Sequence, residues 1–167
     1  MQLTPIGTIR TPFRVATGTP IQPVRAKGTR GTVEIFAPYV EGLADLAGFE
    51  RIWLLYWFDR ASKARMRVIP YRDRVERSLF ATRAPARPNP IGISCVRLLD
   101  VDGAELHVAE IDILDGTPLL DIKPYVPDYD NYPVTSCGWV DTVPEIPVVA
   151  DARFEQPPEN GTPGKNS

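Results

Sequence analysis

Apolar and polar residues alternate over several short stretches of the chain, a pattern typical of β-strands with one buried face. The clearest alternation covers residues 31–36 (GTVEIF), 91–101 (IGISCVRLLDV) and 105–113 (ELHVAEIDI). Residues 48–58 (GFERIWLLYWF) are the strongest candidate, because their aromatic and branched side chains suit a buried central strand. An Asp-Gly pair at 102–103 predicts a hairpin between two of these strands.

Weaker patterns complete the expected architecture. Residues 3–10, with Gly7 as a bulge, 66–70, 119–126 and 138–140 are expected to form further short strands. Residues 38–46 can form one or two helical turns. About six or seven strands, one short helix and almost no helical periodicity predict a single all-β domain with antiparallel or mixed pairing, either a barrel or a sandwich.

The bulk composition is that of an ordinary globular protein. A chain of 167 residues with 43% hydrophobic and 24% charged residues fits one domain with a real core. No apolar run approaches the roughly 18 residues of a membrane span, and the first ten residues lack the pattern of a secretory signal. We expect the domain to cover residues 1–150, and the Pro-, Gly- and polar-rich tail at 151–167 to be disordered.

Cysteine and histidine give no metal signal. Cys95 and Cys137 lie far apart without ligand spacing, so we expect buried free thiols in a reducing cytoplasm. His107 is the only histidine, and we expect a strand residue there. No metal site is predicted.

Charge is unevenly distributed along the chain. Between Arg60 and Arg87, nine arginine and lysine residues stand against two acidic ones, whereas from Asp100 onward fourteen acidic residues stand against three basic ones. The basic stretch predicts either a phosphate-binding face or a solvated face whose arginines pair with the acidic half. The candidates for RNA contact are Lys63, Arg65, Arg67, Arg72 and Arg74.

Two polar segments could carry chemistry. The stretch FATRAPARPNPIGIS (80–94) contains prolines that stiffen the backbone around Arg83, Arg87 and Asn89. The segment DGTPLLDIKPY (115–125) places Asp121, Lys123 and Tyr125 on one face of a strand. Each segment is consistent with a binding site, but also with an ordinary turn or a solvated face. Smaller polar clusters occur at Gln22 and at Asp59-Arg60.

Common catalytic fingerprints are absent from the sequence. There is no G-x-G-x-x-G after a strand, no P-loop lysine and no G-x-S-x-G. Neither a Rossmann dinucleotide site nor a nucleotide triphosphatase is therefore indicated. We expect Ser94 to be a strand hydroxyl rather than a nucleophile.

Taken together, ATRAPARPNPIGIS followed by DGTPLLDIKPY resembles the TrmO (TsaA-like) family of S-adenosylmethionine-dependent tRNA methyltransferases. The opening PIGTIRTPF, PIQP and FERIWLLYWFD support the resemblance, which extends from residue 6 to about residue 139. It implies a non-Rossmann β-barrel, a homodimer, and N6-methylation of threonylcarbamoyladenosine beside the anticodon of threonine tRNA.

The resemblance also implies residue roles. The methyl donor, S-adenosylmethionine, is expected to contact Pro20, Ile21, Gln22, Asp59, Arg60, Arg83, Ile93, Asp115, Gly116, Thr117 and Pro118. Many relatives appear with histidine in place of Asp59, and some carry an additional C-terminal domain.

The chemistry of methyl transfer adds candidate catalytic residues. Asp121 or Tyr125 could act as base or orienting group, and Lys123 or Arg87 could stabilise an oxyanion. Asn89 is a further candidate between donor, acceptor base and loop structure. Two alternatives stay open: the same donor with a small metabolite or another RNA as acceptor, and a non-catalytic barrel that binds an anionic ligand or RNA.

Overall fold

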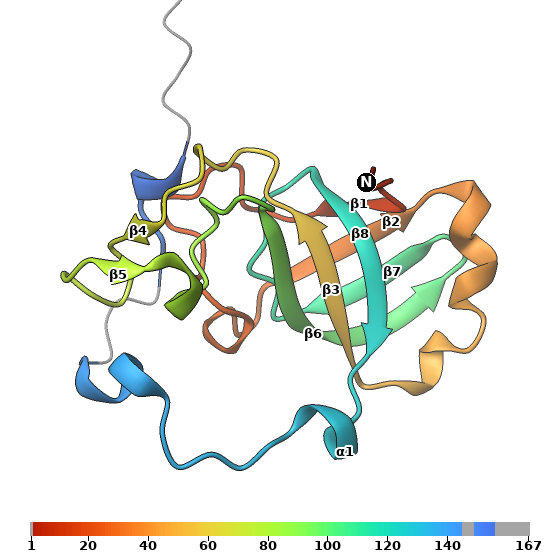
Figure 1. The fold of residues 1–167 in the computed structure, drawn as a ribbon. Helices are drawn as coiled ribbons and strands as arrows, with labels where there is room; N and C mark the ends of the chain where they lie inside the picture. The colour runs from red at the N-terminus through yellow and green to blue at the C-terminus, as the bar shows by residue number, and fades with distance from the viewer. Residues whose placement is uncertain (1, 145–148, 156–167) are drawn as a thin grey trace, which may run out of the picture.

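The fold is a closed six-stranded β-barrel with irregular segments at one end (Figure 1). A computed structural model describes residues 2–144 and 149–155. The barrel strands are β1 (Gly7–Arg10), β2 (Arg30–Ile35), β3 (Arg51–Trp57), β6 (Ile91–Asp102), β7 (Glu105–Ala109) and β8 (Thr117–Pro124). The prediction of an all-β barrel is confirmed, and the sandwich alternative is excluded by the closure of the sheet.

Every barrel pairing is antiparallel, and the order around the barrel is β1-β2-β7-β6-β3-β8. The closing pair joins β1 to β8, with Gly7 opposite Leu119 and Ile9 opposite Thr117. β1 pairs in regular register with β2 as well, so Gly7 is not a bulge. It is instead a point of close approach, because an added Cβ would overlap the backbone of Glu34.

The alternation seen in the sequence describes the inside and outside of this barrel. On β3, Ile52, Leu54 and Tyr56 are buried inside, while the intervening residues are half-buried on the outer wall. β6 and β7 follow the same period, with Val96 and Leu106 fully buried. These inward side chains form one continuous core.

A second, smaller unit is formed by residues 61–90, which we call the loop lobe. It contains the two-stranded sheet of β4 (Arg67–Val68) and β5 (Arg77–Ser78), followed by the 3-10 helix η4 (Leu79–Ala81). Val68, Leu79 and Ala86 form its own apolar cluster. The loop lobe therefore has apolar packing of its own.

The start of the predicted disordered tail is packed against the loop lobe. The 3-10 helix η6 (Ala152–Phe154) places the Phe154 ring, 4% exposed, in the lobe's apolar cluster, 5.1 Å from the ring of Tyr71. The guanidinium of Arg65 lies 5.5 Å from the same ring. Residues 151–155, the start of the tail expected to be disordered, are thus held by packing, while residues 156–167 lie outside the described part of the chain.

The remaining elements are short. They are η1 (Pro23–Arg25), η2 (Ala37–Leu43), η3 (Leu46–Gly48), α1 (Pro127–Asp130) and η5 (Gly138–Thr142). η2 matches the expected helical turns, but residues 138–140 are a 3-10 helix instead of the predicted strand. Gly138 adopts a positive φ of 63°, which does not suit an extended strand.

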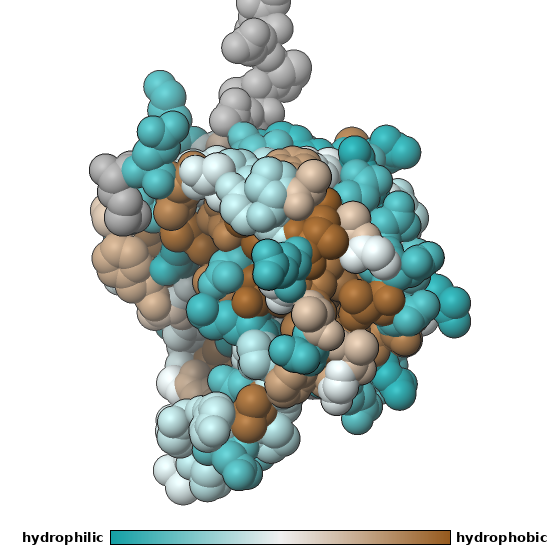
Figure 2. Space-filling model, turned by 90° about the vertical axis from the view of Figure 1, so that its right-hand side faces the viewer, coloured by the Kyte–Doolittle hydropathy of each residue, from teal (hydrophilic) through white to brown (hydrophobic). Residues whose placement is uncertain are grey.

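The two ends of the barrel differ. η2 and η3 cover one end, whose surface mixes hydrophilic and hydrophobic side chains (Figure 2). The loop lobe lies against the other end, and residues 131–144 pass along its lower edge in Figure 1. We call residues 131–144 the strap.

Two smaller expectations are tested by the fold. Cys137 is exposed and Cys95 is half-buried, so neither thiol is buried as expected, although both are free. His107 is a half-buried residue of β7, as expected. Across the described ranges, no helix has the length and apolar character needed to cross a membrane.

Candidate active site

A cavity of about 810 Å³ lies between the open end of the barrel and the loop lobe. Its floor comes from the barrel, its outer wall from the loop lobe, and its rim from the strap and the C-terminal segment. This volume is near the upper end of the roughly 300–1,000 Å³ typical of small-molecule sites. The pocket is the main candidate for a functional site in the described residues.

The floor contains a chain of buried polar groups. The hydroxyls of Tyr56 on β3 and Ser94 on β6 lie 3.1 Å apart, and Ser94 Oγ donates to Asp112 Oδ1 at 2.6 Å. Ser94 is 1% exposed and Tyr56 4% exposed. Burial raises the pKa of Asp112 to about 6, although the hydrogen bond from Ser94 acts in the opposite direction. Burial also raises the pKa of Tyr56, so its hydroxyl stays protonated.

The end of β3 is joined to the turn before β8 by one arginine. Arg60 Nη2 donates to the backbone oxygen of Asp115 at 2.9 Å and to Thr117 Oγ1 at 3.0 Å. Arg60 Nε also contacts Asp59 Oδ1 at 3.3 Å. Gly116, with φ 78°, permits the tight turn between them. The guanidinium thus fixes the relative position of two pocket segments.

A second polar bridge crosses the pocket between loops. Arg83 Nη1 of the loop lobe donates to Gln22 Oε1 at 2.8 Å. The Gln22 loop is held in turn by the C-terminal segment, because Pro20 pairs with Val149 and the amide of Ala150 donates to Thr19 O at 2.7 Å. Segments far apart in sequence therefore close one side of the pocket.

The proline-rich loop is shaped by Arg87. Its Nη1 donates to Thr82 O at 3.0 Å and to Ala84 O at 3.4 Å, while its guanidinium carbon lies 5.6 Å from the centre of the Phe80 ring. Phe80 is 75% exposed at the pocket rim. The strap reaches this rim through Trp139, whose indole nitrogen donates to Ala81 O at 2.8 Å.

The structure brings most of the predicted donor-contact residues together. Eight of them line the pocket: Pro20, Ile21, Gln22, Asp59, Arg60, Arg83, Ile93 and Thr117. The other three, Asp115, Gly116 and Pro118, flank Thr117 at the start of β8. Their convergence gives the predicted set a common location, while their contact with a donor stays a prediction.

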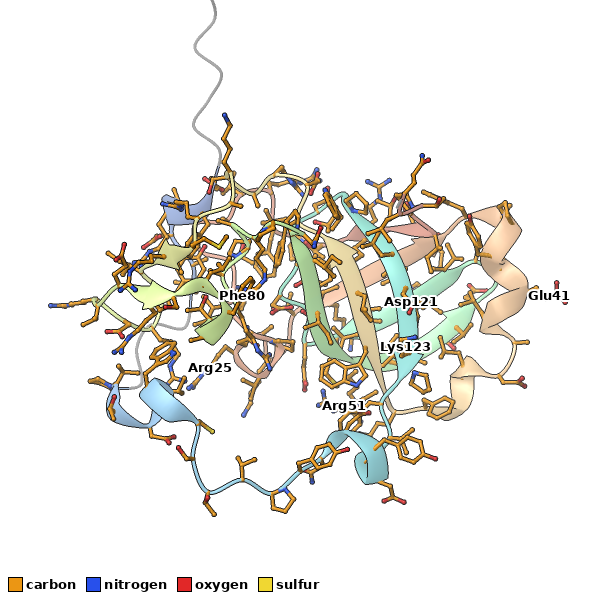
Figure 3. The ribbon with its side chains drawn as sticks, in the orientation of Figure 1. Arg25, Glu41, Arg51, Phe80, Asp121 and Lys123 are labelled. Atoms are coloured by element: carbon orange, nitrogen blue, oxygen red, sulfur yellow. The ribbon has the colours of Figure 1, made fainter. Side chains whose placement is uncertain are left out.

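The predicted catalytic residues are dispersed. Asp121 and Lys123 lie on the outer wall of β8, away from Phe80 (Figure 3), where they form an exposed ion pair at 2.9 Å. Tyr125 packs beside Trp53 with ring centres 5.9 Å apart. The three side chains share a face as expected, but that face is not a wall of the pocket. Arg87 lines the pocket, whereas Asn89 is exposed in the loop that follows it.

The predicted RNA-contact residues also separate into groups. Arg72 lines the pocket. Arg67 is paired with Glu76 at 2.6 Å, and Arg65 donates to Arg153 O at 2.9 Å and contacts Phe154, so both have structural partners. Lys63 and Arg74 are exposed on the loop lobe.

The pocket residues that sequence reasoning missed include Tyr56, Phe80 and Asp112. Tyr56 belongs to an apolar motif, and Phe80 is an apolar residue at the start of a polar segment, so neither gave a polar signal. Asp112 did give one, because it is a lone acid between two isoleucines, Ile111 and Ile113, that are almost fully buried. Ser94 is a strand residue as expected, but its hydroxyl also donates a hydrogen bond to Asp112, which lines the pocket.

The sequence of this chain matches a known protein family. The family model described as the tRNA-methyltransferase O N-terminal domain matches residues 8–131. The chain belongs to this family. The resemblance inferred from the motifs is thereby confirmed.

Two named relatives and one solved structure are also similar to this chain. An S-adenosyl-L-methionine-binding protein of Archaeoglobus fulgidus is 41% identical, covering 78% of this chain and 93% of its own length. A tRNA (adenine(37)-N6)-methyltransferase of Escherichia coli is 35% identical, covering 93% and 71%. The crystal structure of TrmO from Pseudomonas aeruginosa superposes with a TM-score of 0.70 at 41% identity, over 83% of this chain and 62% of the solved one. The chain thus spans less than two thirds of that solved chain.

Proposed function

We propose that this protein is an S-adenosylmethionine-dependent tRNA methyltransferase that methylates N6 of adenine 37. The observation that carries the proposal is the pocket at the barrel mouth, where eight of the eleven donor-contact residues expected from the family converge. Homologues named as S-adenosyl-L-methionine-binding proteins and as tRNA (adenine(37)-N6)-methyltransferases support it.

The chemistry of the pocket fits the donor. Apolar side chains such as Phe58, Ile91 and Ile93 give surfaces for an adenosine group, and Asp59 supplies a carboxylate for a cationic one. Pro20, Ile21, Gln22, Arg60, Arg83 and the Asp115–Pro118 turn would hold the rest. When bound, the donor supplies an electrophilic methyl group on a sulfonium. The protein's part is to align the two reactants and exclude water.

The pocket rim suits RNA. Arg72 and Arg87 are cationic groups at the pocket, and Phe80 presents an exposed ring on which an unpaired base can stack. Lys63, Arg65, Arg67 and Arg74 extend positive charge over the loop lobe, although ion pairing leaves Arg67 with less to offer a phosphate.

The proposal also covers the acceptor nucleoside, the oligomeric state and the cellular compartment. The acceptor is the threonylcarbamoyl form of adenosine 37 in threonine tRNA, the enzyme works as a homodimer, and the reaction takes place in the cytoplasm, where that tRNA is used. The family resemblance supports each of these assignments.

Nucleoside mass spectrometry tests the proposed function. The purified protein is incubated with labelled S-adenosylmethionine and tRNA from a strain that lacks N6-methylation at this position. We expect one methyl group per threonine tRNA, recovered in the threonylcarbamoyladenosine nucleoside. Donor binding without RNA methylation would favour another acceptor, and no donor binding up to millimolar concentration would favour a non-catalytic barrel.

Replacing Phe80 by alanine tests whether the pocket rim binds RNA. Stacking of a base on an aromatic ring contributes roughly 1–3 kcal/mol, so we expect KM for tRNA to rise about tenfold in Phe80→Ala. The dissociation constant of the donor, measured by calorimetry, should change much less. Phe80→Tyr should retain the wild-type KM. The matched control is Phe49→Ala, which removes an exposed ring outside the pocket; equal effects of the two alanine variants would contradict a role in RNA binding.

A further inference from the structure

The polar chain on the pocket floor has a defined direction. Ser94 has one hydroxyl proton and donates it to Asp112 Oδ1 at 2.6 Å. The Tyr56 hydroxyl, 3.1 Å from Ser94 Oγ, must therefore be the donor in the other contact. Three segments, β3, β6 and the turn after β7, supply one residue each, and the chain of donors ends at a carboxylate on the pocket wall.

The surroundings of this carboxylate differ from those of Asp59, another acid of the pocket. Its hydrogen-bond donor Ser94 is neutral and 1% exposed, whereas Asp59 contacts Arg60. The Arg83 charge acts on Asp112 from the loop lobe, but the Arg83 guanidinium is hydrogen-bonded to Gln22. A carboxylate with few cationic contacts in a sheltered site is more basic than one in water.

Asp112 is surrounded by side chains from several elements. From β3 comes Tyr56, from β6 Ser94 and from the loop lobe Arg83, which lowers the pKa of Asp112 while burial raises it. The pocket's further charged or titratable side chains are Asp59, Arg60, Tyr71, Arg72, Arg87, Cys137 and Glu155.

Methylation of an adenine N6 requires a proton acceptor. The N6 lone pair is delocalised into the ring, and the nitrogen must lose its proton as it gains the methyl group. We propose, resting on the function proposed above, that Asp112 is the base that accepts this proton and that Ser94 and Tyr56 are positioning residues that hold its carboxylate. The N6–H pair remains on nitrogen, the nitrogen lone pair forms the bond to the methyl carbon, the C–S pair leaves with sulfur as S-adenosylhomocysteine, and the proton ends on Asp112.

Single-turnover methylation over pH 5–9 with saturating donor tests the base. The wild-type rate should rise about tenfold per pH unit and level off near pH 6, following the pKa of about 6. Asp112→Asn should lower the plateau roughly 10²–10⁴-fold, the usual contribution of a positioned base, and should lose this pH dependence. Its donor dissociation constant, measured by calorimetry, should stay within about threefold of wild type, since an amide keeps the same shape.

The positioning residues have their own signature. Ser94→Ala removes a hydrogen bond that lowers the Asp112 pKa, so its rate profile should level off at a higher pH than that of wild type. Tyr56→Phe should shift the profile without abolishing turnover, because Ser94 still holds the carboxylate. An unchanged profile in both variants would overturn the positioning roles.

Two acidic residues outside the pocket serve as a control and as a test of a rival base. Asp100→Asn, an exposed change on β6, is the matched control and should behave as wild type. Asp121→Asn tests the rival base. Loss of the pH dependence in Asp121→Asn but not in Asp112→Asn would overturn the assignment. A donor dissociation constant raised more than tenfold in Asp112→Asn, with its pH dependence intact, would assign the carboxylate to donor binding and equally overturn it.

Thermal unfolding without donor or RNA gives a readout independent of activity. A pKa raised on folding means that the folded protein is penalised once the carboxyl ionises, so stability falls as pH rises from about 4 to about 6. Asp112→Asn should therefore have a higher Tm than wild type at pH 7.5 and nearly the same Tm at pH 4. An unchanged Tm difference across this range would contradict a sheltered Asp112. Failure of the wild type to methylate tRNA would instead refute the proposed function, whatever the unfolding data show.

Discussion

Alanine in place of Gly92 is expected to lower the free energy of unfolding by about 3 kcal/mol, the upper part of the range for overpacking a core. The added Cβ would overlap ring atoms of Tyr56. That ring cannot move aside easily, because it is buried, packs edge-on against Phe58 at 5.2 Å and is hydrogen-bonded to Ser94. In a chain of this size, such a loss corresponds to a decrease in Tm of about 10 °C.

The matched control for this change is Gly42→Ala. Gly42 lies in η2, its φ is not positive, and an added Cβ would meet no atom within 4 Å. Chemical unfolding should show a change below about 0.5 kcal/mol for the control. Combining Gly92→Ala with Tyr56→Leu should cost less than the sum of the two single changes. Additive costs, or equal losses at the two glycines, would show that the Tyr56 ring is not the obstacle.

Removing the Arg60 guanidinium is expected to weaken donor binding by about 100-fold. Arg60 makes two hydrogen bonds to the turn before β8, at 2.9 and 3.0 Å, and hydrogen bonds to charged groups contribute roughly 1.5–3 kcal/mol each. Losing about 3 kcal/mol of the interactions that hold Thr117 and Asp115 in place corresponds to two orders of magnitude in the dissociation constant. Calorimetric titration of Arg60→Ala with S-adenosylmethionine measures this effect.

Two further variants show whether the loss of donor affinity is specific to the Arg60 guanidinium. Arg60→Lys retains the charge on a shorter side chain, which cannot place an ammonium group where the guanidinium Nη2 makes both contacts, so it should bind the donor with intermediate affinity. Arg10→Ala removes an ion pair of 2.8 Å with Glu34 on the outside of the barrel and should leave donor affinity unchanged. If Arg60→Ala binds the donor as tightly as Arg10→Ala does, the β3–β8 bridge is not needed for the pocket.

Residue periodicity predicted the barrel strands well because a wall with one buried face imposes a period of two. The same period could not show which face is buried. Asp121 and Lys123 were correctly placed on one face of a strand, but that face lies outside the barrel. The pocket is built from strand ends and loops, and their meeting depends on pairings between distant segments, such as Pro20 with Val149.

Asp112, the proposed base, was overlooked because the chain changes phase after β7. Leu106 and Val108 point inward with the period of β7. If that period continued, Glu110 would be buried next, but its backbone turns to φ 60° and the inward positions become Ile111 and Ile113. The apolar positions change phase there, from 106 and 108 to 111 and 113, so residues 105–113 are not one continuous alternating strand. Phe154 was missed for a different reason: a polar, Pro-rich composition concealed one ring that completes the apolar cluster of the loop lobe.

Closure of the barrel through β1 and β8 has a consequence for how the protein is made. Gly7–Arg10 can complete its pairing only after Thr117–Pro124 has left the ribosome. The pocket waits longer still, since Ala150 and Phe154 line it. Proteins dominated by such distant pairings fold slowly, because the entropy of closing long loops is lost before the contacts compensate for it. A ribosome-bound chain would therefore gain donor affinity only after Phe154 has left the ribosome.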